Sequence, residues 1–133
     1  MTGAVADTHT AVWYLFNNPK HSTGARQAIE EAFRAGDQIG VSSISLAEMV
    51  YLSEKGRIPP TAVLDLIHRL FDPGYPLHEL PVDASVAEQM SSIGRDEVPD
   101  MPDRIIAATG LRYGVPVISR DRKIRASRIQ TIW

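Results

Sequence analysis

The chain has 133 residues and a formal net charge of −2 at pH 7, with 44% hydrophobic and 23% charged residues, as in an ordinary globular domain. It contains no cysteine, which excludes disulfide bonds, zinc–thiolate sites and iron–sulfur clusters. Its longest apolar run, residues 11–16, is far shorter than the roughly 20 residues of a membrane-spanning helix, and its start lacks the pattern of a signal peptide. We therefore expect one cytoplasmic domain, residues 1–133, without membrane contact.

Apolar residues recur in turn at the spacing of strands and of helices. In chain order, these patterns and their flanking cap and turn residues predict a strand at 4–6, helices at 11–16 and 22–35, a strand at 39–41, helices at 45–55 and 59–71, a strand at 77–82, a helix at 83–93, a loop at 94–102, a helix at 103–113, and strands at 115–119 and 129–133. Ser45 and Glu48 have the form of a capping box at the start of their helix. The alternation of strands and helices predicts an α/β fold with a central parallel sheet covered on both faces.

Four acidic side chains fall where expected strands end or the following helices begin. Asp7 and Asp121 each follow a strand, and Glu48 and Asp103 lie in the first turns of helices. Because ligands bind at the carboxyl ends of the strands in open parallel sheets, we expect the four carboxylates to converge at one edge. Each acid alone could be a helix cap or a turn residue. Together their repulsion would raise their pKa values and oppose folding unless a cation offset it.

Carboxylates without histidine or cysteine partners suit Mg²⁺ or Mn²⁺ better than zinc. The site could hold one ion or two, and two ions roughly 3.5–4 Å apart can stabilise both the attacking and the leaving oxygen of a phosphodiester. We expect Asp7 and Asp103 to be the central ligands. Glu48 and Asp121 would complete one or both ion sites through water molecules.

Several other side chains are candidates to support this site. The hydroxyls next to the acids are those of Thr8 and Ser119. Residues 100–133 carry seven basic and three acidic side chains, which could hold a phosphate backbone or could equally be a solvated surface. We expect phosphate contacts from three arginines, Arg104, Arg120 and Arg122. His9 is the one histidine expected to touch substrate, and Trp13 is expected to be a core or interface aromatic rather than a stacking platform.

Four short motifs together resemble the PIN-domain ribonucleases. They are Asp-Thr-His at 7–9, Ser-Leu-Ala-Glu at 45–48, Pro-Asp-Arg-Ile-Ile-Ala-Ala at 102–108 and Ile-Ser-Arg-Asp at 118–121. Their order and spacing match the family over essentially the whole chain. Asp7, Glu48, Asp103 and Asp121 stand at the family's acidic positions, and Ser119 stands at its frequent hydroxyl position.

The resemblance implies a three-layer α/β/α sandwich with a central parallel sheet. Small members of the family are often VapC-type toxins, which cleave RNA such as tRNA or rRNA. They are neutralised by a VapB-type antitoxin and commonly form homodimers. Asp100 lies near the expected pocket by spacing and could be an accessory acid. Gly110, in the middle of an expected helix, is a mild departure because it costs helix stability.

Three other interpretations are weighed against this one. A phosphorylatable receiver domain would need an acidic pair after the first strand, which Asp7-Thr8-His9 lacks. A haloacid-dehalogenase-like phosphatase would need a second aspartate two residues after Asp7, where His9 stands. A non-catalytic RNA-binding or protein-interaction module on the same fold is the remaining alternative.

Overall fold

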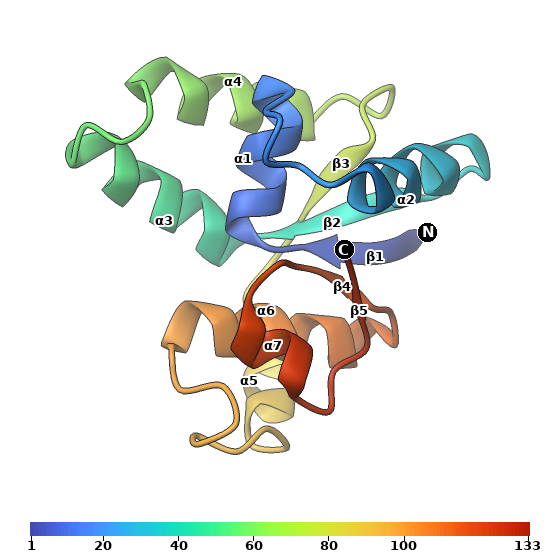
Figure 1. Ribbon diagram of the computed structural model, residues 1–133, viewed down its shortest axis with the longest axis vertical. Coiled ribbons are helices and arrows are strands. Elements are labelled where there is room, and N and C mark those ends of the chain that lie inside the picture. Colours follow the sequence, from blue (N-terminus) through green and yellow to red (C-terminus); the bar gives the residue numbers. More distant parts are fainter.

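The computed structural model describes residues 1–133 and contains a parallel five-stranded sheet (Figure 1). The strands are β1 (Thr2–Ala6), β2 (Gln38–Ser42), β3 (Leu77–Leu80), β4 (Val117–Ile118) and β5 (Thr131–Ile132). Their order across the sheet is β3-β2-β1-β4-β5. The order reverses direction between β1 and β4, and such switch points are where ligands bind in open α/β sheets. The order also differs from the 2-1-3-4-5 order of receiver domains.

Seven helices cover the two faces of the sheet. Figure 1 shows the first four above the sheet, namely α1 (Thr8–Phe16), α2 (Thr23–Arg34), α3 (Ser43–Glu54) and α4 (Pro60–Leu70). Below it lie α5 (Ala84–Met90), α6 (Met101–Tyr113) and α7 (Arg122–Ala126). No helix has the length and apolar character needed to cross a membrane. The predicted α/β/α sandwich with a parallel sheet is confirmed.

Side chains that alternate along the central strand build a separate core on each face. Ala4 and Ala6 of β1 pack into the cluster under α1 to α4, whereas Val5 packs into the cluster under α5 to α7. Successive side chains of a strand point to opposite faces, so a strand buried on both sides must be apolar throughout. All three residues are at most 3% exposed.

The helix α3 begins earlier than its sequence suggests. The N-cap is Ser42, whose side chain accepts a hydrogen bond from the backbone N–H of Ile44. The predicted capping box of Ser45 and Glu48 is therefore wrong, because β2 continues to Ser42 and runs directly into the helix. Ser45 is instead fully buried inside the first turn, and Glu48 lies in the second turn.

The C-terminal segment also differs from expectation. The strand expected at 115–119 is only Val117–Ile118, because the N–H of Val115 still bonds to the carbonyl of Gly110 at the end of α6. The short helix α7 was not predicted, since five residues are too few to show helical periodicity. Its N-cap is Asp121.

Gly110 allows α6 to lie close against the sheet. A Cβ atom at this position would lie 2.8 Å from Cγ2 of Val117 and 3.2 Å from the carbonyl oxygen of Val115. We expect Gly110→Ala to lower the free energy of unfolding by about 1–2 kcal/mol, because overpacking outweighs the gain in helix propensity. Urea unfolding measures this difference. An unchanged or raised midpoint would mean that the helix and strand separate without cost.

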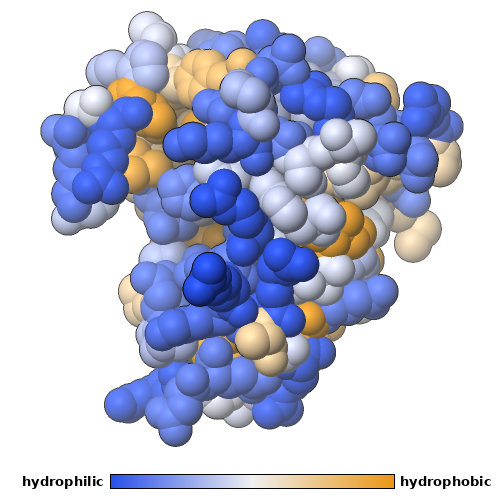
Figure 2. Space-filling model, viewed as in Figure 1, coloured by the Kyte–Doolittle hydropathy of each residue, from blue (hydrophilic) through white to orange (hydrophobic).

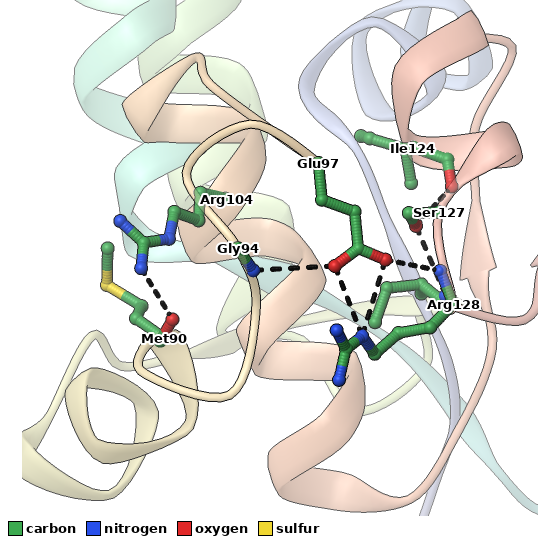
Figure 3. A network of polar contacts seen from close by, with 8 residues as sticks. Met90, Gly94, Glu97, Arg104, Ile124, Ser127 and Arg128 are labelled. Carbon is green, nitrogen blue, oxygen red and sulfur yellow. Dashed lines mark hydrogen bonds and ion pairs between the residues drawn. The ribbon is translucent and has the colours of Figure 1, made fainter.

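A polar network joins the connection before α6 to the segment after α7 (Figure 3). The Glu97 carboxylate accepts hydrogen bonds from the backbone N–H of Arg128 at 2.7 Å and from Nε of the same arginine at 3.1 Å. These contacts lower the pKa of Glu97, and the backbone hydrogen bond is the largest cause. The network therefore ties the segment that carries Asp100 to the segment that follows α7, the helix that Asp121 caps.

Candidate active site

One cavity, of about 450 Å³, contains all four predicted acids. It opens where β1 and β4 end, at the switch point of the sheet. The convergence expected from sequence is therefore present in the structure. Five carboxylates line the cavity, those of Asp7, Glu48, Asp100, Asp103 and Asp121. The other lining residues are Thr8, His9, Trp13 and Arg120.

Asp7 is held by two different hydrogen bonds at the end of β1. It is the N-cap of α1, and its Oδ1 accepts from the backbone N–H of Thr10 at 2.9 Å. Its Oδ2 accepts from the hydroxyl of Ser119 at 2.6 Å. Asp7 is 6% exposed and Ser119 is fully buried, so the orientation of the Asp7 carboxylate is fixed by its two hydrogen bonds.

Ser119 also connects Asp7 to Asp121. The backbone N–H of Asp121 donates to Oγ of Ser119 at 3.0 Å, while the same hydroxyl donates to Asp7. Asp121 caps α7 through Oδ1, which accepts from the N–H groups of Lys123 and Ile124. Both predicted strand-end acids are thus N-caps, and each still lines the cavity.

Glu48 reaches the cavity from α3 and is bound by Thr8. The Thr8 hydroxyl donates to the Glu48 carboxylate and lies 2.9 Å from the hydroxyl of Ser45. Burial raises the pKa of Glu48, and the hydrogen bond from Thr8 partly opposes this shift. Sequence alone did not indicate that Ser45 supports Thr8, because the Ser45 hydroxyl was expected to cap the start of the helix.

Asp103 is the most perturbed acid of the group. Asp100 caps α6 by accepting from the N–H of Asp103 at 3.0 Å, which places the two carboxylates side by side on the cavity wall. Burial, and then repulsion from the other four acids, raises the pKa of Asp103 to about 7. None of the five acids takes part in an ion pair within the chain. The cavity therefore concentrates negative charge that no ion pair within the chain neutralises.

Comparison with known proteins identifies the family of this chain. The PIN domain family matches residues 4–129. The chain belongs to the PIN-domain family. It is 30% identical over 137 aligned positions to ribonuclease VapC22 of Mycobacterium tuberculosis (strain ATCC 25618 / H37Rv), and the match covers all of both chains. The predicted resemblance to PIN-domain proteins of the VapC type is confirmed.

Solved structures agree with the PIN fold. A chain of DNA-bound VapBC from Salmonella typhimurium superposes with a TM-score of 0.68 at 24% identity, over 98% of each chain. A chain of VapBC2 from Rickettsia felis, bound to a DNA fragment from its promoter, gives a TM-score of 0.67 at 17% identity, again over 98% of each chain. At these identities the likeness concerns the fold.

The acids of this PIN domain suit a divalent cation by their chemistry. They are all hard oxygen donors, and a bound cation would offset the carboxylate repulsion that adds to burial in raising the pKa of Asp103. No group of three or more His, Asp or Glu side chains lies close enough together to hold an ion directly. Mg²⁺ commonly keeps several waters and binds one or two carboxylates, so the donor set fits a hydrated ion.

The predicted RNA contacts divide into two groups. His9 and Arg120 line the cavity of the PIN domain, whereas Arg104 and Arg122 do not. Nη2 of Arg104 donates to the carbonyl of Met90 at 2.8 Å, so its guanidinium is directed towards α5 (Figure 3). Arg122 is exposed in the first turn of α7.

Trp13 lines the cavity, although its sequence context predicted a core or interface position. It is partly exposed and is the one hydrophobic side chain in the cavity wall. Its ring stacks with that of His9, with ring centroids 5.5 Å apart and an interplanar angle of 30°. The i, i+4 spacing of His9 and Trp13 on α1 could have indicated this pair.

Proposed function

We propose that this PIN domain is a metal-dependent endoribonuclease that hydrolyses RNA phosphodiester bonds, and that it acts as one domain over residues 1–133. The observation that supports this most strongly is one cavity lined by five carboxylates that take part in no ion pair within the chain. They include the four acids that the sequence resemblance places at the family's acidic positions. Its relative VapC22 is named a ribonuclease. The negative charge of the cavity would lower the affinity of a protein that only bound RNA, which disfavours the non-catalytic alternative.

The roles of the individual residues follow from their contacts. Asp7 and Asp103 would hold the ion or ions, and Glu48 and Asp121 would complete the site through water. Bound Mg²⁺ or Mn²⁺ would supply an activated water near neutral pH and offset charge on the scissile phosphate. Two hydroxyls keep the carboxylates oriented, that of Ser119 on Asp7 and that of Thr8 on Glu48. Asp100 acts as an accessory acid that adds to the negative field at Asp103.

Basic residues beside the cavity would bind the RNA backbone. Arg120 is exposed and lines the cavity, so its guanidinium can reach a phosphate next to the scissile one. Arg122 is exposed on the adjacent helix. Arg104 is the weakest of the predicted contacts because it bonds to Met90. Figure 2 shows a strongly hydrophilic surface at the centre of the view, where β4 leads into α7.

We further propose that the protein is the toxin of a toxin–antitoxin pair, with tRNA or rRNA as substrate, a VapB-type antitoxin as partner and a homodimeric state. The structural relatives are VapBC complexes, which supports the antitoxin partner. Large hydrophobic side chains are exposed on α3 and α4, and an apolar surface lies between these helices at the upper left of Figure 2. The exposed residues include Val50, Tyr51 and Leu64.

The chemistry of the cut ends tests the proposed reaction. Purified protein is incubated with a pool of structured RNAs in Mg²⁺ or Mn²⁺, with and without chelator. Attack by water with departure of the 3′ oxygen leaves 5′-phosphate and 3′-hydroxyl ends, and cleavage should stop when the chelator is added. Ends with a 2′,3′-cyclic phosphate, or cleavage that persists in chelator, would contradict the proposal and reveal a different mechanism or enzyme.

A further inference from the structure

His9 and Trp13 form an aromatic ridge between two cavities. Both residues line the acidic cavity, and both also line a second cavity of about 510 Å³ farther along α1, towards its C-terminal end. This second cavity has a mixed wall, in which Val12 and Ile58 are apolar and Lys20 and Arg57 are basic. An RNA chain that passed from the acidic cavity into the second cavity would therefore cross this ridge.

Trp133 and Arg120 contact the Trp13 ring of the ridge, whereas His9 is exposed to solvent. The Trp13 ring packs against Trp133, with ring centroids 5.8 Å apart and an interplanar angle of 59°. The guanidinium of Arg120 lies 5.4 Å from the Trp13 ring centroid, within the range of a cation–π contact. His9 is exposed, so its stack with Trp13 can be extended by one more ring.

The charges on the two sides of the ridge differ in sign. The acidic cavity repels an RNA backbone, so the affinity for RNA has to come from groups next to it. Lys20 and Arg57 are exposed in the second cavity, and neither takes part in an ion pair within the chain. They can therefore contact phosphates that lie beyond the ridge.

We propose that the aromatic ridge binds an unpaired base of the RNA, next to the phosphate held in the acidic cavity. This inference rests on the proposed ribonuclease function. The base extends the His9–Trp13 stack, Arg120 contacts its phosphate, and the chain continues towards Lys20 and Arg57. A base that is stacked inside an RNA double helix cannot also stack on a protein ring, so the substrate is single-stranded at this nucleotide. Stacking on an aromatic side chain tolerates any base, because every base has a π face.

The test compares RNA with and without bases. Fluorescein-labelled hexaadenylate and the same oligomer with single abasic nucleotides are bound to the full chain carrying Asp103→Asn, which keeps the RNA intact. Anisotropy gives each dissociation constant. We expect Trp13→Ala to weaken hexaadenylate binding about 10-fold, and His9→Ala to weaken it as well. Replacing one adenosine by an abasic nucleotide should weaken binding to the Asp103→Asn protein by a similar factor. The same replacement should not weaken binding further when Trp13→Ala is also present.

Matched controls separate this inference from a general loss of structure. Phe71→Ala and His68→Ala remove an exposed aromatic and an exposed histidine at the C-terminal end of α4, outside both cavities, and neither should change binding. Trp13→Phe should retain most of the affinity because a ring remains. Because His9 is exposed, His9→Ala should leave the urea-unfolding midpoint nearly unchanged.

Two outcomes would overturn the inference. If Trp13→Ala and His9→Ala lowered the affinity for hexaadenylate and for a fully abasic oligomer equally, the ridge would contact the RNA backbone and not a base. Binding that is unchanged in both variants would show that the ridge faces something other than RNA, such as a protein partner. In either case, metal-dependent cleavage by the wild-type chain would still support the proposed function. Failure of the wild-type protein to cleave or bind any RNA would overturn both this inference and the proposed ribonuclease function.

Discussion

Asp103→Asn is expected to reduce RNA cleavage by at least about 100-fold and to stabilise the metal-free protein at pH 7.5. The loss of cleavage follows from removing a central carboxylate ligand, since even outer partners of metal ligands change activity or affinity by 10–100-fold. The gain in stability follows from the pKa of Asp103, which is about 7 in the folded chain against an ordinary value of 3.8. Asparagine has nearly the same shape and carries no charge.

The pH dependence gives the sign of this effect. Between pH 3.8 and about 7 the folded protein binds more protons at Asp103 than the unfolded chain does. The free energy of unfolding therefore falls as the pH rises through this window, and the variant lacks this fall. We expect a difference on the order of 1–2 kcal/mol at pH 7.5, because solvent screens a partly exposed carboxyl.

Urea unfolding in chelator at pH 5, 6, 7 and 8 measures this prediction. The midpoint of the wild-type protein should decline with pH more steeply than that of Asp103→Asn, and the two should be closest at pH 5. A variant that is less stable than the wild type at pH 7.5 without metal would contradict the assigned electrostatic strain at Asp103.

Substitutions of Asp7 should separate its structural role from its charge. Asp7→Ala removes the cap of α1 and leaves the buried Ser119 hydroxyl without its acceptor. We expect it to abolish cleavage and to cost about 2–4 kcal/mol of stability, the sum of a lost cap and an unsatisfied buried group. Asp7→Asn keeps an oxygen that can accept from the N–H of Thr10, so it should lose cleavage but destabilise the protein less.

Cleavage assays and urea unfolding of both variants test this separation. Asp83→Asn is the matched control, because Asp83 also caps a helix through its side chain but lies outside the acidic cavity. It should retain wild-type cleavage. Cleavage by Asp7→Asn at the wild-type rate would show that the negative charge of Asp7 is not needed for the reaction.

Most of the fold was predictable because each element has a local signal. Ser22 and Asp83, the first residues of the helices predicted at 22–35 and 83–93, are the N-caps of α2 and α5, and Gly114 ends α6 in the left-handed conformation. The parallel sheet followed from the alternation of strands and helices. The start of α3 was misread because Ser42 and Ser45 are both plausible caps, and only the pairing of β2 decides between them. Strand order depends on contacts between distant segments, which local patterns do not show.

The acidic residues of the candidate site could be predicted from the sequence, but the hydrogen bonds that orient them could not. Asp7, Glu48, Asp103 and Asp121 could be placed at one edge because each follows a strand or opens a helix near a strand end. The hydrogen bond from the Ser119 hydroxyl to Asp7 could not be foreseen, since it joins residues 112 positions apart. The exposure of Trp13 on the cavity wall likewise depends on how α1 packs against the C-terminal segment.

The most direct measurement is the rate of RNA cleavage in Mg²⁺ or Mn²⁺ by the wild-type chain, Asp103→Asn and Asp65→Asn, assayed side by side. Asp65 is a half-exposed acid paired with Arg69 on α4, outside the cavity, so its variant controls for loss of a carboxylate elsewhere. We expect the wild type and Asp65→Asn to cleave at similar rates, Asp103→Asn to be inactive, and chelator to stop all cleavage. Cleavage by Asp103→Asn at the wild-type rate would contradict the assignment of the reaction to this cavity.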